Sequence, residues 1–227
     1  IMTVLYLSLL PVMEWLVTHT HITAFNTVLG LIIFCGIQVL MIRKMKLTPK
    51  DLGFHFNVPH NVIVKTVLIT VLFCLFLLVF KAVLVDTVKF LQGLPLLAPK
   101  GMHDHSGNEM SSLQMLIFAL SYVLFCPLQV FLIHCAMQGI LQDVLPSRAG
   151  RIFALVFGVV AMCVVHIPAG PVFALSVIIP AILWGYLYMK YRNAYLVTAS
   201  HILIGLWALF VLDYVEVFFL IHYLGLK

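Results

Sequence analysis

Charged side chains are scarce in this sequence: they make up 9% of its 227 residues, while apolar residues make up 63%. The mean hydropathy of +1.15 lies far outside the range of water-soluble proteins, so a soluble enzyme or binding domain is excluded. The 13 basic residues outnumber the 8 acidic ones, but they are scattered between apolar stretches and form no basic domain. This pattern excludes nucleic acid as a partner and indicates a membrane surface.

Metal-binding motifs are also missing from the sequence. One His-x-His pair, His103 and His105 around Asp104, lies on a polar loop, where such groups are more often solvated than metal-bound. The cysteines are odd in number, lie inside apolar stretches and show no ligand spacing, which is typical of small buried side chains. They are Cys35, Cys74, Cys126, Cys135 and Cys163. No repeat of roughly 20 to 50 residues, heptad pattern or low-complexity run is evident.

Long apolar runs recur along the whole chain, and a helix needs about 20 such residues to cross a hydrocarbon layer about 30 Å thick. These runs predict membrane spans at Met2–Val17, Ala24–Ile42, Val62–Val85, Leu113–Leu141, Ile152–Val165, Pro171–Met189 and Leu196–Leu212. The shorter apolar tail Tyr214–Leu226 predicts either a tilted eighth helix or a segment that lies against the bundle. We therefore expect an all-α fold, a polytopic transmembrane helical bundle of seven or eight spans, forming a single integral membrane domain over residues 1–227.

Basic residues predict the direction of the spans, because Lys and Arg next to span ends concentrate on the cytoplasmic side. They occur around alternate connections, at Arg43–Lys50 with Lys65, at Arg148 and Arg151, and at Lys190 and Arg192. We expect these connections to be cytoplasmic, and the N-terminus of this multi-pass protein with them. The first span carries Glu14 and lacks a basic start, so we expect it to remain in the bundle and not to be a removable signal peptide.

A few polar side chains interrupt the apolar runs. Such groups are costly in hydrocarbon, so they face a bundle interior or a wet cavity and mark candidate functional sites. His134 and Gln138 are four residues apart and share one helix face, as do His201 and Gly205. The whole set comprises Glu14, Gln38, Lys81, Gln129, His134, Gln138, His166 and His201, with Asp213 and Glu216 near the last junction.

Three segments that contain these residues resemble the motifs of a known family. Gln129–Gln142 (QVFLIHCAMQGILQ) resembles Gln-x-x-x-Glu-Glu-x-x-x-Arg-Gly-x-Leu, Met162–Pro168 (MCVVHIP) resembles Phe-x-x-x-His-x-Pro, and His201–Gly205 (HILIG) resembles His-x-x-x-Asn. These are motifs of the CPBP family, also called the Abi or CAAX-protease family of glutamate-dependent intramembrane endopeptidases. Leu52–Phe54 (LGF) and Gly185–Asn193 (GYLYMKYRN) agree with the family in order and spacing, so that the resemblance covers roughly residues 40–210.

The chain departs from this family at the residues that carry the chemistry. The resemblance implies that the first Glu of the pair activates water, with the histidines and the Asn in support. Here the Glu positions are Ile133 and His134, the Arg is Gln138, the Phe is Met162 and the Asn is Gly205, while His166 and His201 match. An isoleucine neither accepts a proton nor orients water, so we do not expect the inherited mechanism to run through Ile133.

Three classes of function remain open. The first is a catalytically defective family member that acts as a membrane-embedded binding or accessory subunit for another membrane protein or a lipid-like chain, with no cofactor expected. Its binding site would comprise Gln138, Ile133, Gly205 and Met162. The second is an active intramembrane endopeptidase whose rearranged site uses His134, His166 and His201, either as catalytic groups or as ligands of a zinc ion. The third is a subunit in which two bundle histidines bind haem or a pigment.

The family resemblance also predicts how the bundle is packed. The fourth, fifth and seventh spans should pack against one another, with His134 or Gln138, His166 and His201 on their mutual faces. Ile133 should lie beside these side chains and fill the place of the family's carboxylate. Burial of an imidazole away from hydrocarbon favours the same arrangement, because lipid offers that ring no hydrogen-bond partner.

Overall fold

The computed structural model describes residues 23–98, 110–167 and 171–224, and these residues are mostly helical and contain no strand. In chain order the elements are α2 (Thr23–Lys44), α3 (His60–Thr87), η1 (Lys89–Leu91), α4 (Ser112–Gln129), η2 (Val130–Gln138), α5 (Gly139–Val144), α6 (Arg148–His166), α7 (Pro171–Ser176), α8 (Ile178–Tyr191), α9 (Ala194–Leu206), η4 (Trp207–Val211) and α10 (Tyr214–Leu224). Here η1 is a 3-10 helix, while η2 and η4 are π-helical. The predicted all-α fold class is confirmed.

Five helical segments are long and apolar enough to cross a membrane by length and composition: His60–Thr87, Ser112–Val144, Arg148–His166, Pro171–Tyr191 and Ala194–Val211. Each of them coincides with a predicted span. The predicted span Ala24–Ile42 corresponds to α2, whereas Met2–Val17 lies outside the described residues. The tail forms α10, whose 11 residues extend only about 16 Å, and it packs against η1, η4 and α7. The chain is a multi-pass integral membrane protein.

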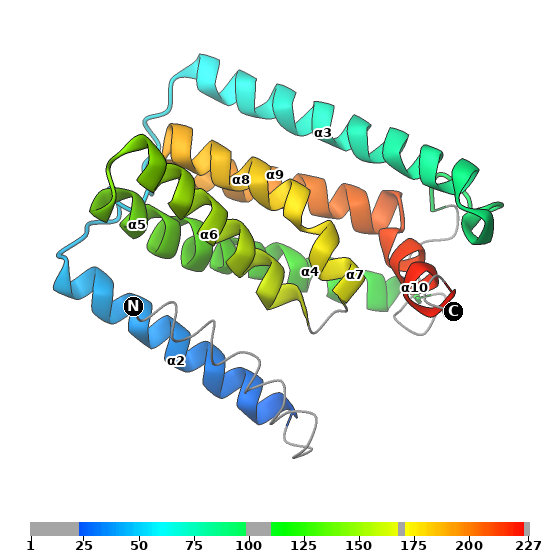
Figure 1. The fold of residues 1–227 in the computed structure, drawn as a ribbon, viewed down its shortest axis with the longest axis horizontal. Helices are drawn as coiled ribbons and strands as arrows, with labels where there is room; N and C mark the ends of the chain where they lie inside the picture. The colour runs from blue at the N-terminus through cyan, green and yellow to red at the C-terminus, as the bar shows by residue number, and fades with distance from the viewer. Residues whose placement is uncertain (1–22, 99–109, 168–170, 225–227) are drawn as a thin grey trace.

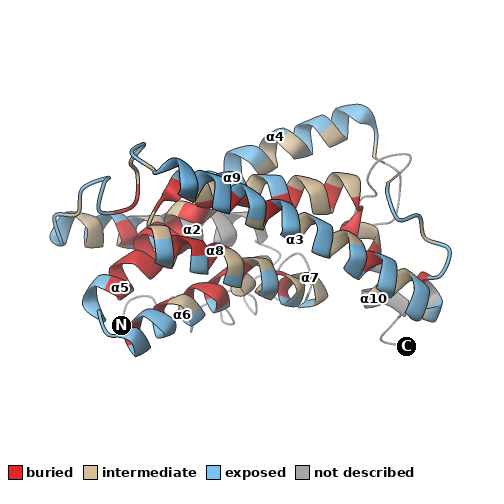
Figure 2. Ribbon diagram, turned by 90° about the horizontal axis from the view of Figure 1, so that it is seen from above, coloured by how far each residue is buried: buried red, intermediate tan, exposed pale blue. Residues whose placement is uncertain are grey.

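The helix α3 buries polar side chains and exposes apolar ones, which is the opposite of a surface helix in a soluble protein. The buried residues of α3 are all polar, namely Thr66, Thr70 and Lys81, and Figure 2 shows exposed residues along the length of this helix. The Thr70 hydroxyl lies 2.9 Å from the Ser200 hydroxyl of α9, and the Lys81 ammonium donates a hydrogen bond to the Leu212 carbonyl. An apolar outer surface of this extent is stable where hydrocarbon surrounds it.

Most of the polar side chains singled out in the sequence lie inside the bundle. Gln38, Lys81, His134, Gln138, His201 and Asp213 are buried, while Gln129, His166 and Glu216 are half-buried. Glu14 lies outside the described residues. The expectation that polar groups avoid the lipid-facing surface is therefore met wherever the structure describes them.

The helix α8 lies between α6 and α9 in the bundle (Figure 1) and packs against both of them and against η2. The fourth predicted span, through η2, contacts α6 and α9 as expected. The fifth and seventh predicted spans do not pack face to face, however, because α8 separates them. That part of the packing prediction is wrong, since an inward-facing imidazole needs only a protein neighbour: α8 supplies one to His201, and α7 supplies one to His166.

Polar caps determine where three of the spans begin. At the start of α4, Ser111 and Gln114 form a capping box in which each side chain accepts a hydrogen bond from the other residue's backbone N–H. The Ser147 hydroxyl accepts from Gly150 N at the start of α6, and the Asn193 side chain caps α9. Because these caps satisfy N–H groups that lack an intrahelical partner, they fix the register of the helices that carry the histidines.

The connection between α2 and α3, residues 45–59, is tied to the turn between α8 and α9, and we call it the elbow. Ala194 N donates to Gly53 O at 2.9 Å, and Asn193 Nδ2 donates to His55 O at 2.8 Å. Gly53 has a φ of +84°, and a Cβ at this position would lie 2.7 Å from Arg192 O. Only glycine fits this conformation and this close approach of two backbones.

Candidate functional site

His134 and Gln138 are completely buried and form a hydrogen-bond chain to α8. Gln138 Nε2 donates to Gly185 O at 2.8 Å, and His134 Nδ1 lies 2.8 Å from Gln138 Oε1. Because the Gly185 carbonyl can only accept, the Gln138 amide turns its NH₂ to Gly185 and its oxygen to His134. The neutral His134 ring therefore carries its proton on Nδ1. Its Nε2 has a free lone pair and no hydrogen-bond partner.

Two glycines make room for the Gln138 side chain between α6 and α8. A Cβ at Gly158 would lie 3.1 Å from Gln138 Oε1, and a Cβ at Gly185 would lie 3.3 Å from the same atom. The C=O of Gly185 is also the acceptor of the Gln138 amide. Small residues on the two flanking helices thus fix the amide that orients His134.

His201 lies on α9 against the indole of Trp184 on α8. The two rings are stacked with their centroids 3.8 Å apart, and His201 is only 2% exposed. His201 Nδ1 and Trp184 Nε1 are buried without a hydrogen-bond partner, as is His134 Nε2. A buried polar atom without a partner costs about 1–3 kcal/mol, so three of them in neighbouring helices mark this region as a candidate functional site.

His166 is oriented differently from the other two histidines. Its Nδ1 lies 2.7 Å from the Met162 carbonyl on its own helix, and its ring packs against Phe173 with centroids 5.6 Å apart. Among the residues that the structure describes, no three His, Cys, Asp or Glu side chains are grouped closely enough to hold a metal ion. His134, His166 and His201 do not form such a group in this structure.

The positions that differ from the family pattern are filled by close packing. Ile133 is 2% exposed and Met162 is fully buried, and both belong to the main apolar core. A Cβ at Gly205 would overlap the Tyr122 hydroxyl, which donates to the His201 carbonyl at 3.3 Å. The Tyr122 ring, on α4, thus occupies the space that the family's Asn side chain would require.

Sequence reasoning missed Tyr122 and Trp184. It selected ionisable and amide side chains inside the spans, whereas these aromatic rings pass as ordinary apolar side chains in a hydropathy profile. One signal was available: Tyr and Trp concentrate at membrane interfaces, whereas Tyr122 and Trp184 stand well inside the predicted spans. A buried aromatic side chain with a polar atom at such a depth needs a partner within the protein.

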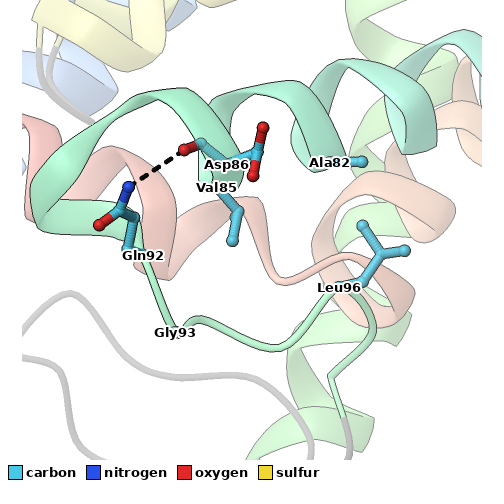
Figure 3. Close-up of a pocket in the computed structure, with 6 residues that line it drawn as sticks. All are labelled: Ala82, Val85, Asp86, Gln92, Gly93 and Leu96. Atoms are coloured by element: carbon cyan, nitrogen blue, oxygen red, sulfur yellow. Dashed lines mark hydrogen bonds between the residues drawn. The ribbon is translucent and has the colours of Figure 1, made fainter.

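A pocket of about 410 Å³ lies at the far end of α3, away from these residues (Figure 3). It is lined by Ala82, Val85, Asp86, Gln92, Gly93 and Leu96. Gln92 Nε2 donates to the Asp86 carbonyl at 3.1 Å and closes the turn after the helix. None of the lining residues belongs to η2, α6, α8 or α9, so this pocket is separate from the histidine site.

Comparison with known families agrees with the motifs. Residues 112–207 match the family described as type II CAAX prenyl endopeptidase Rce1-like. The matched segment runs from the start of α4 to the start of η4 and contains His134, His166 and His201 together with every position that departs from the family pattern. No curated protein and no solved structure matches the chain. Over this segment, the chain is similar to the CPBP, or CAAX protease-like, family.

Proposed function

We propose that this protein uses the CPBP fold as a membrane-embedded binding or accessory subunit, and that it does not hydrolyse peptide bonds. The observation that carries the proposal is the packing at Ile133. This residue stands where the family has its water-activating Glu, and it is buried in an apolar core. Neither a general base nor space for water is present at that position.

The packing of the surrounding residues supports the same conclusion. Tyr122 fills the space beside Gly205, and Gln138 is used in orienting His134. Because Ile133, Gln138, Gly205 and Met162 are all enclosed, a partner would meet the outward faces of the helices and not these side chains. A membrane protein or a lipid-like chain is the partner that such an apolar surface fits.

The test of this proposal is a hydrolysis assay. Purified protein in lipid vesicles is incubated with a prenylated CAAX peptide and with unmodified peptides, and new peptide termini are sought by mass spectrometry. We expect no product above that of protein-free vesicles. Product that is lost in His134→Ala or His166→Ala but kept in His60→Ala, an exposed histidine, would overturn the proposal.

The accessory role has its own test. Chemical cross-linking in native membranes, followed by mass spectrometry, should return the same membrane-protein or prenylated partner in independent preparations. A protein that cross-links no partner above an unrelated multi-pass control of equal abundance would contradict the role, whatever the outcome of the hydrolysis assay.

A second candidate function is favoured by one observation, the free lone pair of His134 Nε2. An imidazole whose Nδ1–H is held by an acceptor has the orientation of a general base. His134 would take a proton from water while the water oxygen attacks a carbonyl carbon, and would return that proton to the leaving amine. Hydrolysis that persists in His201→Ala, disappears in His134→Ala and falls in Gln138→Leu would identify this reaction.

A further inference from the structure

A second pocket lies where the elbow meets the turn between α8 and α9. Its volume is about 460 Å³, and it is lined by Leu47, Lys50, Asp51, His55, Asp143 and Arg192. These residues come from the elbow, the end of α5 and the C-terminal end of α8. The pocket therefore lies at the end of the bundle opposite to the turn that follows α3.

The Arg192 side chain joins two walls of this pocket. Its two terminal nitrogens bind the two oxygens of Asp143 at 2.5 Å each, and its Nε donates to the Asp51 carbonyl at 2.8 Å. These bonds use three of the five N–H groups of the guanidinium. Two N–H donors of Arg192 remain available, and the side chain is held rigidly by its paired contacts.

One oxygen of Asp51 and both oxygens of Asp143 are already engaged in hydrogen bonds. Asp51 Oδ2 accepts from Thr48 N at 2.8 Å and from the Thr48 hydroxyl at 2.6 Å, and these bonds lower the pKa of Asp51, so that it stays ionised. Both oxygens of Asp143 are bound by Arg192. Lys50, by contrast, is exposed and makes no hydrogen bond to any residue that the structure describes. The N–H groups that remain free in the pocket, on Lys50 and Arg192, can therefore donate hydrogen bonds to an anion.

An exposed aromatic pair adjoins the pocket residues in the chain. Phe56 follows the pocket residue His55 in the elbow and is 86% exposed. Its ring stacks on that of Tyr195 at the start of α9, with centroids 4.5 Å apart, and Tyr195 is itself 41% exposed. Exposed aromatic rings at the ends of spans are typical of the headgroup level of a bilayer. The elbow next to the pocket thus has the exposed aromatic rings expected at a membrane interface.

The charges that line the pocket balance, with Lys50 and Arg192 against Asp51 and Asp143, but the chain that leads into it is basic. Between Arg43 and His55 the chain carries four basic residues and one acidic residue. We propose that this pocket binds the phosphate of an anionic phospholipid headgroup, with Lys50 and the two spare N–H groups of Arg192 as donors and with the acyl chains running past Phe56 and Tyr195. This site is distinct from the histidine site, and the inference does not depend on the proposed function.

The test compares the lipids that the full-length protein retains after purification from mixed vesicles of phosphatidylglycerol and phosphatidylcholine, as counted by native mass spectrometry. We expect preferential retention of phosphatidylglycerol, reduced about fivefold in Lys50→Gln because one basic group is lost at the surface. Lys50→Arg should restore it. Lys89→Gln, which removes an exposed lysine at the other end of the bundle, is the matched control and should retain lipid as the wild type does.

Three results would overturn the inference. Equal retention of the two lipids would remove the preference for an anionic headgroup. An equal loss of phosphatidylglycerol retention in Lys50→Gln and Lys89→Gln would show that the preference comes from general surface charge and not from this pocket. Displacement of the lipid by soluble glycerol phosphate would identify the ligand as a free phosphate ester and not as a membrane lipid. Since Lys50 is exposed, its variants are expected to fold, and their unfolding temperatures serve as the check.

Discussion

The amide of Gln138 is the side chain on which the orientation of His134 depends. In Gln138→Leu the His134 Nδ1–H would lose its partner inside the bundle, and the Gly185 carbonyl would keep only its bond within α8. We expect the free energy of unfolding to fall by about 1–3 kcal/mol for the group left unpaired, as measured by thermal unfolding in detergent. Gln142→Leu is the control, because Gln142 is also buried but its Nε2 has no partner to lose. Equal destabilisation by the two variants would contradict the hydrogen-bond chain.

The contact between Gly205 and Tyr122 gives a second prediction at the level of single residues. In Gly205→Ala the new Cβ would overlap the Tyr122 hydroxyl, so the α4 ring must shift, at a cost of about 1–3 kcal/mol. Gly36→Ala adds the same methyl group to α2, where no atom lies within 4 Å. Thermal unfolding should separate the two variants, and a Gly205→Ala protein as stable as Gly36→Ala would show that Tyr122 does not pack there.

For single residues, the sequence predicted which polar side chains are buried, but it did not predict which atoms they contact. The cost of a polar group in lipid acts on each side chain alone, so the inward positions of Lys81, His134 and His201 could be predicted. Which atom each group meets depends on helices far apart in the chain. Neither the stacking of Trp184 on His201 nor the occupation of the Gly205 notch by Tyr122 has a signal in local sequence.

At the level of elements, the elbow is attached by a backbone contact that only glycine allows. In Gly53→Ala the Cβ would lie 2.7 Å from Arg192 O at a φ of +84°. Gly93→Ala is a matched control, since Gly93 has a φ of +93° but no atom within 4 Å. In both variants the left-handed backbone conformation costs an alanine about 1–2 kcal/mol. We expect the free energy of unfolding of Gly53→Ala to fall by more than that. Faster limited proteolysis between α2 and α3 in Gly53→Ala alone would be the direct measurement, and equal rates would contradict the attachment.

Helix boundaries were predictable because length, hydropathy and capping residues are local properties. The order of the helices in space was not. An inward-facing histidine on α6 and another on α9 are consistent with direct contact or with a helix between them, and the structure places α8 there. The glycines Gly158 and Gly185 are the sequence feature that fits this arrangement, since they let α6 and α8 approach around Gln138.

For the molecule as a whole, the apolar residues fall into two classes that hydropathy cannot distinguish. One class packs inside the bundle and the other faces lipid tails, which are as apolar as the side chains themselves. Composition and periodicity predict that a segment such as Ser112–Val144 crosses the membrane. They do not show that its outer turns face lipid while its π-helical part, η2, forms the centre of the core.

Two substitutions to alanine in this span test whether an apolar side chain packs in the core or faces lipid. Ile133 is 2% exposed in the core, whereas Leu124 is 74% exposed on the outer face of α4. Ile133→Ala leaves a cavity among fixed neighbours and should lower the free energy of unfolding by about 2–5 kcal/mol. In Leu124→Ala, lipid chains fill the space, so we expect a change within about 0.5 kcal/mol. Reversible unfolding of both variants in the same bilayer measures the difference. If Leu124→Ala were the more destabilising, Ile133 would face lipid, and the position of the missing carboxylate would have to be assigned to another face of the helix.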